Sequence, residues 1–273
     1  MIIKSILPFI AIGLFLLALL FRRREAGALG WIFIAGYCYF EAFGYFAQDE
    51  YYDGSLSLVF LAFSLLLAFL LLKPKSTPMP NEKGEEDLFF TITKIALITA
   101  VFYFPFSELS FLSELLIYIT TKITSTALNL LNVGVYMVPP SQIYTTSSSF
   151  HEVYKYKPIE IILACTAIQS MVLFIGLIFA VNAPVRRKLK AFFLSVPVIY
   201  GLNILRNTFV ASAYFGQWFG SPLESFYIAH GVIARIGAMI ALIVIAYAVF
   251  VILPEALDLV EDFFRFIFKT TKK

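Results

Sequence analysis

Residues 159–170 read IEIILACTAIQS and open a hydrophobic run that continues to Val181. The run is long enough to cross a bilayer, which takes about 20 mostly apolar residues in an α-helix. A cysteine, a threonine, a glutamine and a serine nevertheless lie in its first half. Because lipid disfavours polar groups without partners, such a cluster usually faces protein or a water-filled cavity. The stretch therefore predicts a membrane fold with a polar site inside it.

The composition also indicates a membrane protein. Of the 273 residues, 60% are hydrophobic and 14% are charged, whereas soluble domains have roughly 45–50% and about 25%. The two cysteines, Cys38 and Cys165, lie on different hydrophobic segments, so we expect no disulfide framework. Two histidines without a His/Cys cluster do not form the pattern of a zinc site. We expect no metal, no cofactor and no nucleic-acid partner.

The hydrophobic pattern predicts an all-α, polytopic membrane helical bundle with about seven transmembrane helices. The first segment is expected to be retained rather than cleaved as a signal peptide, because its arginines follow the apolar stretch instead of preceding it. The expected spans are 2–21, 27–47, 55–72, 88–106, 159–181, 191–210 and 226–253.

The segments between these spans are more polar. Residues 107–132 mix Leu and Ile with Ser, Thr, Glu and Lys at helical spacing, a pattern typical of either a span or an amphipathic surface helix. Residues 73–87 predict a linker, 134–158 and 212–225 predict loops, and 254–273 predict an amphipathic tail.

Basic residues, which stay on the cytoplasmic side, favour one topology. If residues 107–132 form an outer-face amphipathic helix, all four basic clusters fall inside: Arg22–Arg24, the lysines after residue 72, Arg186–Lys190 and the C-terminal lysines. We therefore predict a single integral-membrane domain, residues 1–273. Its parts are four N-terminal spans (1–106), an extracellular helix and loop (107–158), three catalytic spans (159–253) and a cytoplasmic tail (254–273).

This topology brings four reactive or charged side chains to the outer leaflet. Cys165 is expected six residues into an inward-running helix, about 9 Å deep at 1.5 Å per residue. Arg206 is expected near the outer end of the next span, and His230 and Arg235 in the first turns of the last one. The four groups come from three spans, which indicates one common site.

Cys165 is the candidate nucleophile. Most free cysteines are simply small buried side chains, but a helix start or nearby arginines give a thiol thiolate character. Gln169 follows four residues later on the expected helix, so the two would share a face, and Gln169 would orient a substrate or donate to an oxyanion. Thr166 is assigned an orienting role as well.

Arg206 lies between Asn203 and Asn207 at helical spacing, which makes one face of its helix polar. Two interpretations remain open: the arginine reaches toward lipid headgroups, or it stabilises thiolate or oxyanion charge. The two asparagines are assigned to substrate binding or orientation.

Arg235 is expected too deep to reach the headgroups, and an intramembrane arginine is a functional candidate by default. His230 is a candidate base or proton shuttle. Five residues separate the two, which places them about 140° apart on a regular helix. Both reach one atom only if the helix is irregular there. Glu41, the other intramembrane charge, either pairs with an arginine or is structural.

Three motifs resemble those of the exosortase/archaeosortase family: ACTAIQS at 164–170, LRNT at 205–208 and HGVIARIG at 230–237. The resemblance covers the chain from the cysteine motif onward and is closer to archaeosortases, which carry an arginine as the third site residue. One departure is Ala167, where the family pattern has glycine after Cys-Thr. We expect its methyl group to narrow the substrate groove slightly.

The resemblance implies a membrane cysteine peptidase/transpeptidase whose site faces outward. Cys165 would be the nucleophile, Arg206 its electrostatic partner and Arg235 the third member. The implied substrates are secreted proteins whose C-terminal sorting signal has a short motif, one transmembrane helix and a basic end. The new C-terminus would pass to a membrane lipid.

Two other classes of protein are considered. A transporter or channel would use Arg206, Arg235 and Glu41 to line a polar path, but such paths lie at the bilayer midplane and often involve internal repeats. The sequence shows no repeat, and its polar groups gather on one side. A purely structural membrane subunit would leave the depth of Arg235 unexplained.

Overall fold

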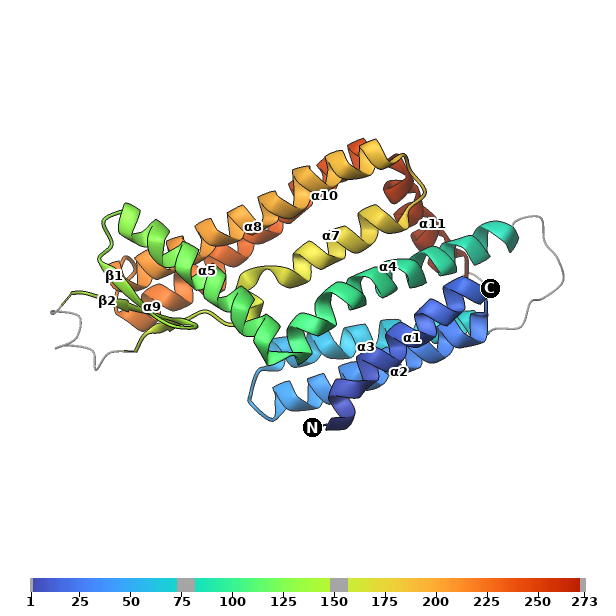
Figure 1. The fold of residues 1–273 in the computed structure, drawn as a ribbon, viewed down its shortest axis with the longest axis horizontal. Coiled ribbons are helices and arrows are strands. Elements are labelled where there is room, and N and C mark those ends of the chain that lie inside the picture. Colours follow the sequence, from blue (N-terminus) through green and yellow to red (C-terminus); the bar gives the residue numbers. More distant parts are fainter. Residues whose placement is uncertain (1, 73–81, 148–156, 271–273) are drawn as a thin grey trace. The chain divides into compact units, whose positions relative to one another are not determined.

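The computed structural model describes residues 2–72, 82–147 and 157–270, which form two compact units. The first unit comprises Met1–Phe104, Gly176–Asn182 and Glu255–Lys273, and the second comprises Pro105–Ile175 and Ala183–Pro254. Helices dominate both units (Figure 1). Much of the predicted linker (73–81) and part of the predicted loop (148–156) lie outside the described residues.

The predicted membrane fold is confirmed. Within the described residues, six helices are long and apolar enough to cross a membrane, and a seventh apolar helix is shorter. The six spans, as helices or parts of them, are Lys4–Phe21, Arg24–Phe46, Tyr51–Leu72, Asp87–Glu108, Val185–Gly216 and Pro222–Ile252. The chain is therefore a multi-span membrane protein.

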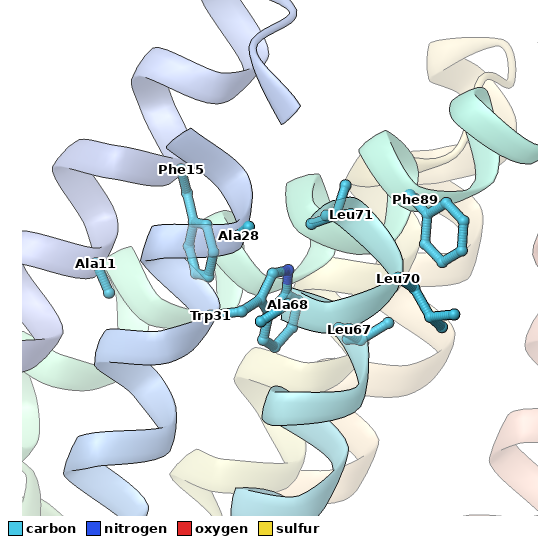
Figure 2. Packing of buried hydrophobic residues seen from close by; sticks show 9 residues of the cluster. All are labelled: Ala11, Phe15, Ala28, Trp31, Leu67, Ala68, Leu70, Leu71 and Phe89. Carbon is cyan, nitrogen blue, oxygen red and sulfur yellow. The ribbon is translucent and has the colours of Figure 1, made fainter. Parts of the chain in front are cut away.

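The first unit is built around four helices: α1 (Ile2–Phe21), α2 (Arg24–Phe46), α3 (Tyr51–Leu72) and α4 (Glu82–Glu108), whose last residues belong to the second unit. In its core the rings of Phe15 and Trp31 lie 5.1 Å apart, near Ala11, Ala28 and Leu67 (Figure 2). Small residues at these contacts let the helix backbones approach closely, which is how helices associate in lipid.

Charged side chains inside the first unit have partners. Lys4 Nζ lies 2.7 Å from Glu41 Oε1, so Glu41 pairs with a lysine and not with an arginine. Lys94 Nζ donates to the carbonyl oxygen of Ala180 at 3.0 Å. Because cations favour the C-terminal end of a helix dipole, Lys94 stabilises the end of the helix that finishes there.

The C-terminal segment also belongs to the first unit. Helix α11 (Pro254–Thr270) carries the amphipathic pattern that the sequence predicts for the tail. The ring centroids of Phe263 and Phe63 are 5.8 Å apart, and those of Phe266 and Phe89 are 5.2 Å apart. The last helix of the chain therefore packs on helices α3 and α4.

The prediction that 159–181 forms one spanning helix is wrong. The segment contains strand β3 (Ile159–Glu160), the 3₁₀ turn η1 (Leu163–Thr166) and helix α7 (Ile168–Ala180). Ala167 separates the turn from the helix with a left-handed backbone, φ 59°. Since α7 has 13 residues, it is about 20 Å long at 1.5 Å per residue. Cys165 precedes this helix, so its predicted depth of about 9 Å within a helix is also wrong.

The second unit contains α5 (Ser110–Leu130), a helix that is not among the six candidate spans. A small antiparallel sheet follows, with β1 (Val135–Val138) beside β2 (Gln142–Thr145) and β2 beside β3. The predicted polar loop thus contains paired strands. Its alternating residues bury Val135 and Ile143 against Leu128 of α5 and Tyr214.

The rest of the second unit is α8 (Val185–Gly216), α9 (Pro222–Phe226), the π-helix η2 (Tyr227–Ile233) and α10 (Ala234–Ile252). The predicted loop at 212–225 is mostly wrong, because only residues 217–221 lie between helices. Ser221 Oγ accepts from the Glu224 N–H, and the Glu224 carboxylate accepts from the Ser221 N–H. This capping box, with proline at the first helical position, starts α9.

The Asn129 side chain bonds to backbone groups on the outer edge of β1. The Thr146 N–H donates to Gly134 O (2.9 Å), and because ladder bonds alternate along an antiparallel pair, the backbone groups of Val135 point away from β2. Asn129 Nδ2 donates to Val135 O (3.0 Å), and Asn129 Oδ1 accepts from Val135 N–H (2.9 Å). The amide thus takes the place of a neighbouring strand.

We expect Asn129→Ala to lower the melting temperature of the detergent-solubilised protein, because two hydrogen bonds, each worth about 1 kcal/mol, are lost. Asn129→Asp keeps the acceptor for the Val135 N–H and loses the donor, so its melting temperature should lie between those of Asn129→Ala and the unmodified protein. Equal stability of all three proteins would show that Asn129 does not hold β1.

Candidate functional site

Cys165 lies in a tight turn between β3 and α7. Its N–H donates to Ile162 O at 2.8 Å, and Thr166 Oγ1 donates to Leu163 O at 2.6 Å. The Thr166 side chain is buried, and its hydrogen bond fixes this turn. Cys165 is half-buried and packs against the hydrophobic cluster of the sheet and Tyr214.

Two asparagines of α8 hold the backbone of Cys165. Asn203 Nδ2 and Asn207 Nδ2 both donate to Cys165 O, at 2.6 and 2.9 Å. Both asparagines are buried. Because residues four apart lie on one face of a helix, they hold the carbonyl as a pair. The two side chains therefore hold the backbone of Cys165 in place.

Arg206 lies between these asparagines and contacts His230. Arg206 Nη2 and His230 Nε2 are 3.0 Å apart. A guanidinium group only donates, so His230 Nε2 is the acceptor and the ring proton of this neutral tautomer is on Nδ1. The ring of Phe226 stacks on His230, with centroids 4.9 Å apart and an interplanar angle of 7°. Arg206 and His230 are thus fixed relative to each other.

The irregular helix that His230 and Arg235 require is present. His230 lies within the π-helix η2, and Arg235 is the second residue of α10. A π-helix bonds each residue to the fifth one along, which changes the angular spacing of side chains from that of an α-helix. The Arg206 and Arg235 guanidinium groups both lie within electrostatic range of His230. Arg235 is exposed, whereas Arg206 is half-buried.

Two candidates remain, Gln169 and Glu41. Gln169 is an exposed residue in the first turn of α7. The prediction that it shares a helical face with Cys165 is wrong, because the left-handed Ala167 separates the turn from the helix. Glu41 belongs to the first unit. No group of three or more metal-ligating side chains occurs among the described residues.

Two aromatic residues of the site were missed from the sequence. Phe226 packs on the same hydrophobic cluster as Cys165 and stacks on His230. Tyr214 packs edge-on against Phe226 and donates from its hydroxyl to Lys157 O at 2.9 Å. Phe226 and His230 are four residues apart, a spacing at which aromatic side chains on a helix meet, so the sequence did contain a signal for this pair.

The fold and this site define a class: a multi-span helical membrane protein with a half-buried cysteine whose carbonyl is held on the arginine-bearing face of a neighbouring helix. A family model described as "Transmembrane exosortase" matches residues 3–251. The chain therefore belongs to the transmembrane exosortase family.

Two relatives are both described as Archaeosortase A. The protein of Natronomonas pharaonis is 33% identical over 195 residues, which cover 64% of this chain and 62% of that one. The match thus spans about three fifths of that relative. The protein of Haloferax volcanii is 27% identical over 292 aligned positions, which cover 95% of this chain and 92% of that one. No solved structure matches the chain significantly.

The left-handed backbone at Ala167 generates a stability prediction. An L-residue pays roughly 1–2 kcal/mol in this region, and glycine does not. Because glycine also makes the unfolded chain more flexible, we expect Ala167→Gly to stabilise the protein by up to about 1 kcal/mol. The measurement is the melting temperature in detergent. Ala164→Gly, in the preceding turn, is the control and should not stabilise.

Removing one asparagine should loosen the Cys165 turn. We expect Asn203→Ala and Asn207→Ala each to destabilise the protein by roughly 1–2 kcal/mol, because each loses a buried hydrogen bond. The double variant should lose more than the sum of the two, since only then is the Cys165 carbonyl unsatisfied. A double-mutant cycle of melting temperatures measures this coupling. Additive losses would argue against a shared role.

Proposed function

We propose that the protein is a membrane cysteine peptidase and transpeptidase that removes the C-terminal sorting signal of secreted proteins. The observation that carries the proposal is the pair of bonds from Asn203 and Asn207 to the Cys165 carbonyl. They fix the thiol-bearing residue on the face of α8 that presents Arg206. Membership of the exosortase family and the two Archaeosortase A relatives support the same class of reaction.

In the proposed reaction, the Cys165 thiolate attacks the carbonyl carbon of the peptide bond beside the sorting motif. Arg206 stabilises first the thiolate and then the oxyanion of the tetrahedral intermediate. The C–N bond breaks, the tail leaves as an amine that takes up the proton released by the thiol, and the rest of the substrate remains as a thioester on Cys165. A lipid headgroup nucleophile or water then resolves the thioester.

His230 is the proposed proton carrier. Its Nε2 accepts from Arg206 in the present arrangement, so this nitrogen takes up the thiol proton only after the guanidinium turns toward the sulfur or the oxyanion. The exchange couples the two events: as Arg206 moves to the developing negative charge, it frees the base. Arg235 supplies a second positive charge near His230 and is the proposed third member of the site.

The proposed setting is the outer face of an archaeal cell membrane. The positions of the basic clusters favour the Cys165 end of α7 lying outside, and both Archaeosortase A relatives come from archaea. The tail of the substrate would cross the membrane with its basic end inside, so the cleaved bond would lie near the surface.

The test is a secreted reporter that carries the C-terminal motif, hydrophobic helix and basic end of a protein encoded in the same genome. We expect Cys165→Ala and Cys165→Ser to abolish removal of this tail, measured by mass spectrometry of the reporter's C-terminus. Cys38→Ala should leave it unchanged. A transporter would tolerate Cys165→Ala, so tail removal that persists in both Cys165 variants would exclude the enzyme.

Arg206 gives a graded test. Loss of an oxyanion donor typically lowers the rate by about 10²–10³-fold, which we expect for Arg206→Ala. Arg206→Lys keeps the charge but not the planar fork, so its rate should lie between those of Arg206→Ala and the unmodified enzyme. Unchanged rates in Arg206→Ala would remove the arginine from the reaction.

A further inference from the structure

The two outer edges of the small sheet differ in the hydrogen bonds that their backbone groups make. At β1 the Asn129 amide bonds to both backbone groups of Val135 and blocks the edge at that residue. Proteins commonly protect exposed strand edges, because unpaired N–H and C=O groups form a template for another strand. The opposite edge, along β3, leads directly to Cys165.

The hydrogen-bond register shows which groups of β3 point outward. The Ile161 N–H donates to Ser141 O at 2.9 Å, and Ile143 lies opposite Ile159. Since ladder bonds alternate, Ile159 and Ile161 face β2, and the backbone groups of Glu160 and Ile162 point away from it. Among the described residues, none bonds to the backbone of Glu160 or to the Ile162 N–H.

The edge of β3 is accessible. Glu160 is exposed, and the Ile162 residue is 55% exposed. The C-terminal end of this edge is bonded to the candidate nucleophile, because the Ile162 carbonyl accepts the Cys165 N–H at 2.8 Å. A strand bonded to the free groups of Glu160 and Ile162 would therefore end beside Cys165.

We propose that the substrate segment before the cleaved bond binds as an added strand along this free edge, with the cleaved bond at the Cys165 end. The proposal rests on the proposed function. An extended peptide is the chemistry that fits, since unpaired backbone groups are best satisfied by another backbone. Close to lipid these backbone groups need hydrogen-bond partners more strongly, because unsatisfied backbone groups are especially unfavourable there.

The direction of the bound strand follows from the substrate. Its folded body lies outside and its hydrophobic helix in the membrane, so the segment before the cleaved bond runs from outside toward Cys165. Strand β3 runs the same way, from the sheet toward the apolar helix α7, and the two strands are parallel. Backbone pairing supplies affinity independently of sequence, while alternate side chains of this segment face the two sides of the sheet and set specificity.

A proline tests the backbone contact. Glu160→Pro removes an outward N–H, whereas the bonds to β2 come from Ile159 and Ile161. Glu160→Ala keeps this N–H and is the matched control, because both variants lose the bond from Ser141 Oγ to the Glu160 carboxylate. We expect Glu160→Pro to remove the reporter tail about five- to tenfold more slowly than Glu160→Ala, as one lost hydrogen bond implies. Equal rates would overturn the proposal.

Disulfide trapping tests the strand without relying on the proline variant to fold. Glu160→Cys is placed in the Cys165→Ala background, and single cysteines are moved along the reporter segment before the cleavage site. Neighbouring strands bring Cβ atoms within disulfide reach. We expect trapping at the one reporter position opposite residue 160, at least severalfold above its two neighbours, whose side chains face the other side of the sheet. No trapping, or equal trapping at that position and its neighbours, would overturn the proposal.

Two controls separate the outcomes. Tyr136→Cys in the same background places an exposed thiol on β1, where Asn129 occupies the edge, and should trap nothing. The Cys165→Ala protein alone reports the background from Cys38. If Cys165→Ala abolishes tail removal but Glu160→Cys traps nothing, the strand proposal fails and the proposed function stands. If the tail is still removed in Cys165→Ala, the proposed function fails and the strand proposal fails with it.

Discussion

The carbonyl oxygen of Cys165, held by Asn203 and Asn207, is the constraint on which the site depends. In a regular helix this oxygen would accept an amide N–H four residues later, and the cysteine would point wherever the helix turned it. Here the helical bond is replaced by two side-chain donors from α8. The second helix thereby decides where the sulfur lies, and the same helix carries Arg206. Position and charge are supplied by one rigid element.

This arrangement explains how backbone without helical structure is accommodated in so apolar a stretch. Irregular segments at membrane depth are tolerated where protein satisfies their polar groups. The Cys165 turn meets this condition through Thr166, Ile162 and the two asparagines. Phe226 then joins the cysteine's hydrophobic surroundings to the His230 ring. The polar contacts and the aromatic stack together make the second unit a continuous scaffold for its three candidate groups.

Much of the helical architecture could be predicted from composition and periodicity, because long apolar runs have few alternatives in lipid. Helices α1 to α4 follow the predicted spans, and α1 matches the predicted 2–21. The errors concern backbone geometry that hydropathy does not encode. The left-handed Ala167 interrupts an unbroken apolar run, and glycine, the residue expected there by resemblance, is the one that favours such a backbone.

Other errors had signals that were available. Ser-Pro-Leu-Glu at 221–224 is a helix start, yet the residues around it were predicted to be a loop. The irregular helix was foreseen only as a condition for His230 and Arg235 to meet, since hydropathy and helical spacing do not predict a π-helix. The contacts of Asn203 and Asn207 with Cys165 depend on how two distant segments pack, and helical spacing alone showed only that the asparagines share a face.

The packing of α11 has a consequence for biosynthesis. Its phenylalanines complete a core whose other members belong to α3 and α4. Domains generally fold as they emerge from the ribosome, with N-terminal parts first. In this protein the N-terminal helices are made before α11, so they enter the bilayer before these partners exist. Until α11 has been made, the aromatic side chains of α3 and α4 lack these partners, and membrane insertion and final assembly become separate events in time.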